Sequence, residues 1–401
     1  MKKDLIAEVV EVASKKKLFR ETINCFIEAA KKESKAFGMK VVLAALVAAL
    51  NFSALVALAA PAPSNTEWEK TVAAARQEGQ VVVTGPPGAD VRDALTEGFQ
   101  KKYPGIRVDY DASTVRDFVP RIVAERKAGQ FLWDVFVHGS GELLIPMGAF
   151  DPIEPALILP DIKDPKTWRG GKMEFLDPGK MIIIMTPFQR GTIFYNTSTK
   201  VVNPKEFKSY KDLLDPKWKG KIVADDPRRP GPGQATFALF ALHPELGADF
   251  IRALGKQQLT FLRDWAQEVD LVAQGKYPLL IGVADFVANA KAKQGVPIGV
   301  IDPRQLKEGS DQSPADGTLA LFNRAPHPNA AKVYINWLLS KEGQTIFTRP
   351  TGYISSRLDV PTDHAPAWRV PQPGSIKTYT KAALQMKDKD MLPLLQEVFG
   401  R

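Results

Sequence analysis

Strand and helix patterns alternate along residues 80–141, and this alternation limits the possible fold more than any other feature of the chain. Short apolar runs at 80–85, 106–110 and 133–137 have the length and β-branched content of buried strands. Between them, apolar residues recur at helical spacing over 90–103 and 113–129. The order β-α-β-α-β predicts a parallel sheet covered by helices, and therefore an α/β protein.

The later part of the chain repeats this theme less regularly. We expect strands at 180–186, 191–196, 220–226, 259–262, 277–285 and 317–323, and helices at 265–275 and 328–347. The polar turns that follow the strands come from both halves of the chain. In open α/β sheets, ligands bind beyond the carboxyl ends of the strands. A ligand that touches turns from both halves is therefore expected to lie between two lobes.

Composition excludes several classes of function. The 401 residues suffice for two domains, and the apolar and charged fractions of 44% and 25% are typical of a soluble globular protein. The net charge of +9 is spread along the chain without a basic stripe, which argues against nucleic-acid binding. The one cysteine, Cys25, forms no disulfide framework, and the four histidines lack metal-ligand spacing.

No catalytic or cofactor motif is present. The sequence has neither a P-loop nor a dinucleotide fingerprint. The stretch "HGSG" at 138–141 resembles a hydrolase elbow, but that motif needs glycine two residues before the serine, where this chain has His138. We therefore expect a protein that is not an enzyme and that uses no cofactor and no metal.

The N-terminal part has the features of an export signal. Residues 39–59 form an alanine-rich apolar run that ends in Ala57-Leu58-Ala59, the small-x-small pattern that signal peptidase cleaves. We expect cleavage before Ala60 and a periplasmic mature protein; an uncleaved membrane anchor is the alternative. Residues 1–38 are a doubtful extension, because Met39 also suits a start site.

Four stretches together resemble one known family: "LLDPKWKGKIVADDP", "IFYNTSTKV", "RAPHPNAAKVYINWLLSKEGQ" and "DVFVHGSGELL". They are similar to family 1 extracellular solute-binding proteins of bacterial ABC importers, nearest the ferric-ion-binding branch, over about residues 66–360. The resemblance implies a two-lobed periplasmic-binding-protein-like (class II) fold with the ligand cleft between lobes joined by crossing strands. It also implies a monomer that captures a solute and delivers it to a membrane permease and its ATPase.

The family topology implies lobe boundaries as well. Crossings are expected near 150–155, 283–286 and 326–329. Lobe one would then comprise 66–152 and 284–328, and lobe two would comprise 153–283 and 329–401.

The sequence differs from the iron binders of this branch at the residues that bind the iron. The early turn "TGPPGAD" has no histidine, and "VADF" at 283–286 stands where those relatives have a tyrosine pair. Ferric iron prefers tyrosinate and carboxylate oxygen donors. We expect no tyrosinate-bound iron, and the alternative function is ferric binding with a synergistic anion, using Asp285.

The stretch 223–242 ends a strand in a glycine-rich turn and opens an apolar helix. The first turn of a helix has unpaired N–H groups and a partial positive charge, and both favour an oxyanion. We expect this turn to hold the anionic group of a small solute: an organic phosphate, a phosphonate or a carboxylate. The candidate contacts are Gly231, Gly233, Gln234 and either Arg228 or Arg229. The alternative is that both arginines pair with Asp225 and Asp226 on the surface.

The remaining candidate solute contacts also follow or end strands. For His138, Tyr195 and Phe286, an ordinary place in a turn or in the core is the alternative interpretation. The sequence does not identify the solute. The candidates are Thr84, Gly85, His138, Gly139, Ser140, Tyr195, Arg263, Asp285 and Phe286.

Overall fold

The computed structural model describes residues 66–139 and 141–400, which belong to one compact unit. The expected extension (1–38) and signal peptide (39–59) lie outside the described residues, as does Ser140. Within the described part, no helix is both long and apolar enough to cross a membrane. The α-helices are α3 (Thr66–Glu78), α4 (Ala89–Lys102), α5 (Val115–Lys127), α6 (Pro160–Lys163), α7 (Pro232–Leu242), α8 (Gly247–Gly255), α9 (Trp265–Ala273), α10 (Asp285–Lys293), α11 (Pro328–Leu339), α12 (Lys341–Thr351), α13 (Lys381–Met386) and α14 (Leu392–Phe399).

The first sheet has the strand order β2-β1-β3-β13-β4, and β5 also pairs with β13. Strand β1 runs parallel to β2 and β3, which confirms the expected β-α-β-α-β segment, with α4 and α5 as the connecting helices. Strand β13 is antiparallel to β3, β4 and β5. The strands are β1 (Gln80–Gly85), β2 (Arg107–Ala112), β3 (Val135–Phe136), β4 (Phe150–Asp151), β5 (Ile182–Ile184) and β13 (Thr318–Phe322).

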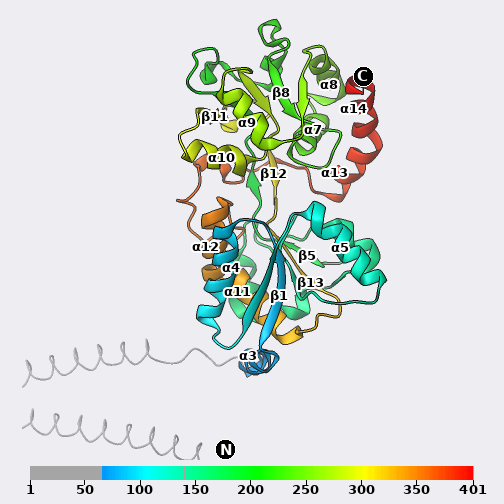
Figure 1. The fold of residues 1–401 in the computed structure, drawn as a ribbon, viewed down its shortest axis with the longest axis vertical. Helices are drawn as coiled ribbons and strands as arrows, with labels where there is room; N and C mark the ends of the chain where they lie inside the picture. The colour runs from blue at the N-terminus through cyan, green and yellow to red at the C-terminus, as the bar shows by residue number, and fades with distance from the viewer. Residues whose placement is uncertain (1–65, 140, 401) are drawn as a thin grey trace, which may run out of the picture. The chain divides into compact units, whose positions relative to one another are not determined.

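Helices α3, α4, α11 and α12 pack against one another beside this sheet (Figure 1). Phe99 of α4 contacts Trp337 of α11, with ring centroids 5.3 Å apart. The single helix expected over 328–347 is divided into α11 and α12. The division falls at Ser340, whose hydroxyl caps α12 by accepting the Gly343 N–H at 3.2 Å.

The second sheet has the order β11-β7-β10-β8-β9. Side chains alternate across it: Ile222 and Ala224 lie in the same apolar cluster as Phe237 of α7, whereas Val223 lies with Val269 of α9. Helices therefore cover both faces. Strands β8, β9 and β10 are parallel, and β7 is antiparallel to its neighbours β10 and β11. The strands are β7 (Ile193–Asn196), β8 (Ile222–Asp225), β9 (Thr260–Leu262), β10 (Leu279–Ile281) and β11 (Ile298–Val300).

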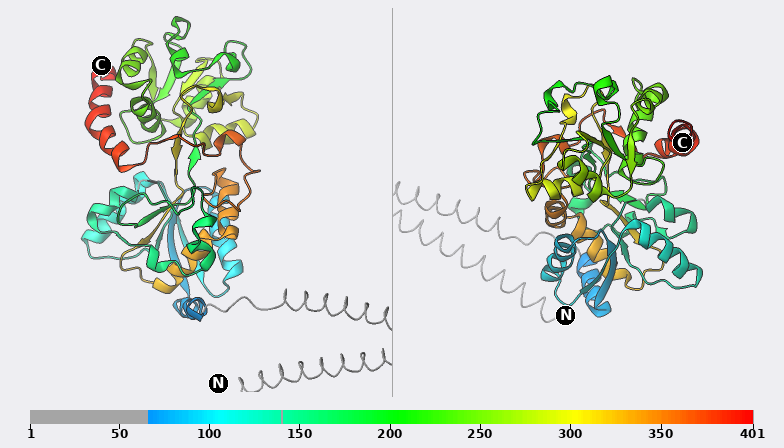
Figure 2. Two further views of the ribbon diagram at one scale, coloured as in Figure 1. Left: turned by 180° about the vertical axis from the view of Figure 1, so that it is seen from behind. Right: turned by 45° about the horizontal axis from the view of Figure 1, so that its top comes forward.

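A small third sheet joins these two bodies, which we call the first and second lobe after their sheets. It consists of β6 (Phe188–Gln189), β12 (Asp311–Ser313) and β14 (Ile376–Lys377), in the order β14-β12-β6. Each strand lies where the chain passes between the lobes (Figure 1). After the last passage, α13 and α14 run along the second lobe (Figure 2), where α14 packs on α8.

The position of these crossings corrects the sequence expectation. The chain crosses at β6, β12 and β14, not near 150–155, 283–286 and 326–329. A short apolar strand has the same pattern in either sheet, so its sequence does not reveal which sheet it joins.

Sheet membership also differs from the expected lobe boundaries. Strand β5, expected in lobe two, pairs with β13 of the first sheet, and α11 and α12 pack on α3 and α4 of the first lobe. Helix α10 and strand β11, expected in lobe one, belong to the second lobe. The first lobe therefore includes much of 153–187 and 329–370, and the second lobe includes 285–300.

Candidate functional site

The carboxyl ends of β1, β3, β8 and β10 carry most of the candidate residues. Because β1 and β3 are parallel to each other, their following turns meet at one edge of the first sheet, and the same holds for β8 and β10 in the second sheet. Helices α7 and α10 begin directly after β8 and β10. This is the position at which open α/β sheets bind ligands.

His138 is a buried, neutral member of the first-lobe edge. It is fully buried, with its ring centroid 5.8 Å from that of Phe118, and its Nε2 lies 2.9 Å from Thr84 Oγ1. The Thr318 hydroxyl donates to its carbonyl oxygen. Burial lowers the pKa of His138 to about 4, so the imidazole is uncharged near neutral pH. Thr84 and His138 are therefore in contact with each other, and a solute contact by either residue stays a prediction.

The glycines at this edge lie close to neighbouring groups of the protein itself. The Gly139 N–H donates to Asp316 Oδ1 at 3.3 Å. A Cβ at position 85 would collide with the hydroxyl of Tyr110, which donates to the Pro86 carbonyl at 3.0 Å. Burial raises the pKa of Asp316.

The N-terminus of α7 is already bound by a carboxylate of the same chain, that of Asp225. Asp225 Oδ2 accepts the Gly233 N–H at 2.8 Å, and Asp225 Oδ1 accepts the indole N–H of Trp265 at 3.2 Å. A Cβ at position 233 would collide with the Asp225 carbonyl oxygen. The Gly233 amide, expected to contact a solute, is thus engaged by a carboxylate eight residues earlier. Gly231 is the N-cap at φ 153°, and Gln234 is buried.

The two arginines of the turn have different surroundings. Arg228 donates from Nε to Asp226 Oδ1 at 2.7 Å and from Nη1 to the carbonyl of Phe399 at 2.5 Å, so it fastens the end of α14. Arg263, which is mostly exposed, also reaches Asp226, at 3.4 Å. Arg229 is exposed, and its side chain has no ion pair within residues 66–139 and 141–400. Of these two arginines in the described chain, Arg229 is therefore the one whose guanidinium is left to bind a solute.

Two buried ion pairs involve the connecting segments: Asp285–Arg369 joins the last segment to the second lobe, and Arg190–Asp311 joins the other two segments to each other. Arg369 Nη2 donates to Asp285 Oδ2 at 2.8 Å, and the same oxygen accepts the Gly191 N–H at 3.0 Å. Arg190 donates from Nε to Asp311 Oδ2 at 2.9 Å. Burial raises the pKa of Asp285, and the positive charges of Arg369 and Arg190 oppose this shift. Asp285 thus anchors the segment that returns from the first lobe.

Several buried polar atoms on these segments and after strands β3 and β10 have no hydrogen-bond partner within the described chain. Buried polar atoms are normally paired with protein, water or ligand. Their concentration where the chain crosses between the lobes marks a polar region that a solute or water can satisfy. The atoms are His138 Nδ1, Thr186 Oγ1, Gln189 Oε1, Asp285 Oδ1, Asp311 Oδ1 and Arg369 Nε.

The two aromatic candidates lie in different places. Phe286 is 49% exposed and meets Trp265 edge-on, with centroids 6.0 Å apart, near the start of α10. Tyr195 pairs with Leu279, at the amino end of β10, and its ring packs beside Gly299. The structure therefore does not bring Tyr195 together with the other candidates.

Sequence reasoning missed Arg190, Asp311, Asp316 and Arg369. They lie on connecting strands and turns whose location depends on the crossings, and no local motif distinguishes Arg190, Asp311 or Arg369. The Asp-Gly turn before β13 was the one available signal for Asp316. Over the described ranges, there is no group of three or more histidine, cysteine, aspartate or glutamate side chains that would hold a metal ion.

Comparison with known proteins gives a family match and a fold match. The sequence pattern described as bacterial extracellular solute-binding protein matches residues 94–372. An uncharacterized protein of Haemophilus influenzae is 28% identical over 141 residues, which cover 35% of this chain and 39% of that protein. The chain thus aligns with less than half the length of that relative.

Several periplasmic binding proteins of known structure have a similar fold. Ferric iron-binding protein A of Mannheimia haemolytica, in an open conformation, has a TM-score of 0.61 at 16% identity, covering 80% of this chain and 98% of that one. IdiA (FutA) of Trichodesmium, with iron and citrate, has 0.58 at 20% identity, covering 80% and 100%. AfuA of Actinobacillus pleuropneumoniae, with fructose-6-phosphate, has 0.55 at 18%, covering 80% and 99%.

Proposed function

Since the chain belongs to the bacterial extracellular solute-binding protein family, we propose that it is the periplasmic subunit of an ABC importer that captures a small anionic solute and delivers it to the permease and its ATPase. The solute binds between the strand-end turns of the two lobes. The chain performs no chemistry on it. Cleavage before Ala60 would release the mature protein into the periplasm, and N-terminal sequencing of exported protein tests this.

The observation that carries the anionic preference is the charge balance before α7. Arg228 and Arg263 share the single carboxylate group of Asp226, while Arg229 has no ion-pair partner in the described part of the chain. Asp225 is engaged with the helix amide and an indole. The turn therefore has one guanidinium, that of Arg229, without a carboxylate partner in the described part of the chain, on an exposed position beside the strand end. A planar guanidinium favours carboxylate or phosphate oxygens.

Two of the structural neighbours, one of them also bound to iron, have small anions as ligands, which supports the proposal of this solute class. Citrate and fructose-6-phosphate, named with FutA and AfuA, are small anions with several oxygen acceptors. We propose the same general class for this chain: an organic phosphate, a phosphonate or a carboxylate. Ferric binding with a synergistic anion is less favoured, because the one suitable carboxylate, Asp285, is paired with Arg369.

A thermal-shift screen tests the solute class. Sugar phosphates, phosphonates, dicarboxylates and aromatic acids are compared with neutral sugars at matched ionic strength. A solute present at about 100 times its dissociation constant stabilises the native protein by about 2.7 kcal/mol, which gives a clear rise in Tm. A rise with neutral sugars alone would contradict the proposal.

Calorimetry with the best solute tests the residue. Arg229→Gln should weaken binding by roughly ten- to a hundredfold, because a charge-assisted hydrogen bond contributes about 1.5–3 kcal/mol. The control is Arg304→Gln, which removes an exposed arginine paired with its neighbour Asp302. If Arg229→Gln binds like the parent, the excess charge is a surface feature. Recovery of the solute unchanged after long incubation tests the absence of turnover.

A further inference from the structure

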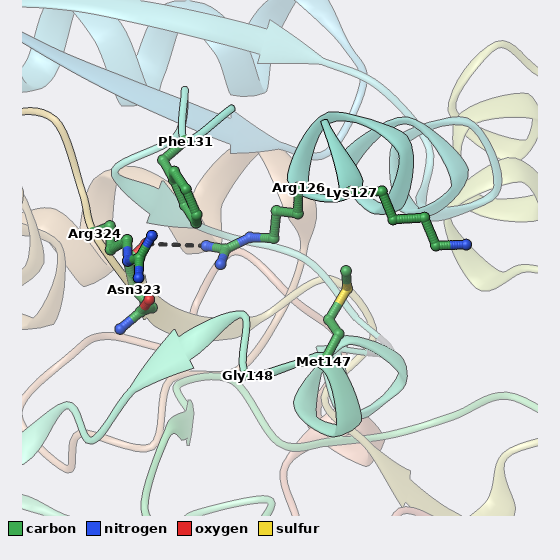
Figure 3. Close-up of a pocket in the computed structure, with 7 residues that line it drawn as sticks. All are labelled: Arg126, Lys127, Phe131, Met147, Gly148, Asn323 and Arg324. Carbon is green, nitrogen blue, oxygen red and sulfur yellow. Dashed lines mark hydrogen bonds between the residues drawn. The ribbon is translucent and has the colours of Figure 1, made fainter. Parts of the chain in front are cut away.

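A basic cavity lies on the first lobe, away from the strand ends described above. It has a volume of about 300 Å³ and lies between the end of α5, the turn before β4 and the turn after β13 (Figure 3). Its lining residues are Arg126, Lys127, Phe131, Met147, Gly148, Asn323 and Arg324.

The cavity is separate from the solute region. Strand β13 begins at Thr318, whose hydroxyl bonds His138, and ends at Phe322, next to the cavity. Five strand residues at about 3.3 Å each span roughly 15 Å. An ion in the cavity therefore lies at the opposite edge of the first sheet from the strand-end turns.

Three cations line the cavity, and within residues 66–139 and 141–400 none of them forms an ion pair. Arg126 donates through Nη2 to the carbonyls of Ala149 and Asn323, at 2.9 and 3.0 Å, and its buried Nε has no partner there. Burial, followed by the positive charge of Arg324, lowers the pKa of Arg126, although a guanidinium stays protonated. The charges of the two arginines thus repel each other, and the negative charge of Asp151 offsets this only in part, since the pKa of Arg126 is still lowered.

The two guanidiniums lie over the same aromatic ring. The Cζ atoms of Arg324 and Arg126 lie 4.6 and 5.1 Å from the centroid of Phe131. Figure 3 shows Arg126 extended towards Asn323 and Arg324, with Phe131 next to them. Two guanidiniums close together on one ring favour a ligand with two negative charges, because both can donate to its oxygen atoms.

We propose that this cavity is a second anion site, which binds the phosphate group of a small molecule between Arg126 and Arg324. Guanidinium groups match phosphate oxygens in geometry and charge. The volume exceeds that of a phosphate group, and Phe131 and Met147 offer apolar contact to an attached organic group. This second site is independent of the solute site, and it would give the same subunit a second ligand.

Titration with inorganic phosphate tests the site. Isothermal calorimetry is performed with phosphate at constant ionic strength set by chloride, and arginine Nε–Hε resonances are followed by NMR. Phosphate should saturate with a dissociation constant of about 1 mM or lower. Phenyl phosphate should bind more tightly than inorganic phosphate if the ligand is a phosphomonoester; equal binding would assign the site to free phosphate.

Arg324→Gln is the decisive variant, because Arg324 is exposed and makes no hydrogen bond that holds the fold in the described chain. It should weaken phosphate binding by about tenfold or more. Lys127→Gln should have a smaller effect, since water screens the exposed ammonium. Arg126 is kept, because its guanidinium also binds two backbone carbonyls.

Two further measurements separate this site from the solute site and from general charge effects. Arg349→Gln, the control, removes an exposed arginine that pairs with Asp363 and should leave phosphate binding unchanged. Arg324→Gln should leave solute affinity unchanged, whereas Arg229→Gln should leave phosphate affinity unchanged. Failure to saturate by about 20 mM phosphate, equal weakening by the control, or loss of solute binding in Arg324→Gln would each overturn the proposal.

Discussion

Replacement of Glu268 by glutamine should change how stability depends on pH. Glu268 lies in the first turn of α9, is fully buried, and has no hydrogen-bond partner for either carboxyl oxygen among the described residues. Burial, followed by the negative charges of Asp225 and Asp264, raises the pKa of Glu268 from 4.5 to about 9. The folded protein therefore keeps this carboxyl protonated at neutral pH.

The sign of the effect follows from proton linkage. Between pH 4.5 and about 9, the folded state binds a proton at Glu268 that the unfolded state has lost. Stability from this group is thus present below the unfolded pKa and is lost as pH rises through this window. One proton gives a slope of at most about 1.4 kcal/mol per pH unit, or about 2.7 kcal/mol between pH 5.5 and 7.5.

Glu268→Gln removes the proton and should remove this slope. The glutamine amide lacks partners in the same place, so it adds a constant cost of about 1–3 kcal/mol that does not vary with pH. The diagnostic quantity is therefore the difference in free energy of unfolding between variant and parent, which should increase by up to about 2.7 kcal/mol over two pH units.

Urea unfolding followed by circular dichroism, at about half-unit steps between pH 5.5 and 7.5, measures this difference. Glu97→Gln, on an exposed face of α4, is the control and should parallel the parent. If the curves of Glu268→Gln and the parent also run parallel, Glu268 is ionised in the folded protein and the reasoning is refuted.

Three further predictions concern the candidate site. The Hε1 resonance of His138, whose pKa burial lowers to about 4, should not titrate between about pH 5 and 8, and a midpoint near 6.5 would contradict the buried neutral ring. Asp225→Ala removes the acceptor of the Gly233 and Trp265 N–H groups and should lower the free energy of unfolding by about 2–4 kcal/mol, measured with urea; a loss no larger than that of Asp363→Ala, at an exposed position, would count against it. Ferric citrate should produce no visible tyrosinate-to-iron absorption band, because "VADF" has no paired tyrosines. A coloured protein would contradict the prediction that this chain binds no iron through tyrosinate.

The candidate site shows how far sequence reasoning reaches. The sequence predicts a helix after the turn that follows β8, and the structure has α7 at that position. The sequence did not reveal that Asp225 occupies the Gly233 amide, because an acid eight residues away reaches that amide only once β8 and α7 are packed. The alternative interpretation, in which both arginines pair with Asp225 and Asp226, holds for Arg228, which pairs with Asp226, but the described residues offer no ion pair for Arg229.

The sequence by itself determined the α/β class, the β-α-β-α-β segment and the family, because strand and helix periodicity is local and repeats within a few residues. Only the tertiary structure decided where the chain crosses between the lobes and which charges meet there. Asp285 pairs with Arg369 over 84 positions, and Arg190 pairs with Asp311 over 121. Such pairs form because burial makes an isolated charge costly, and burial is a property of the packed molecule that no local pattern specifies.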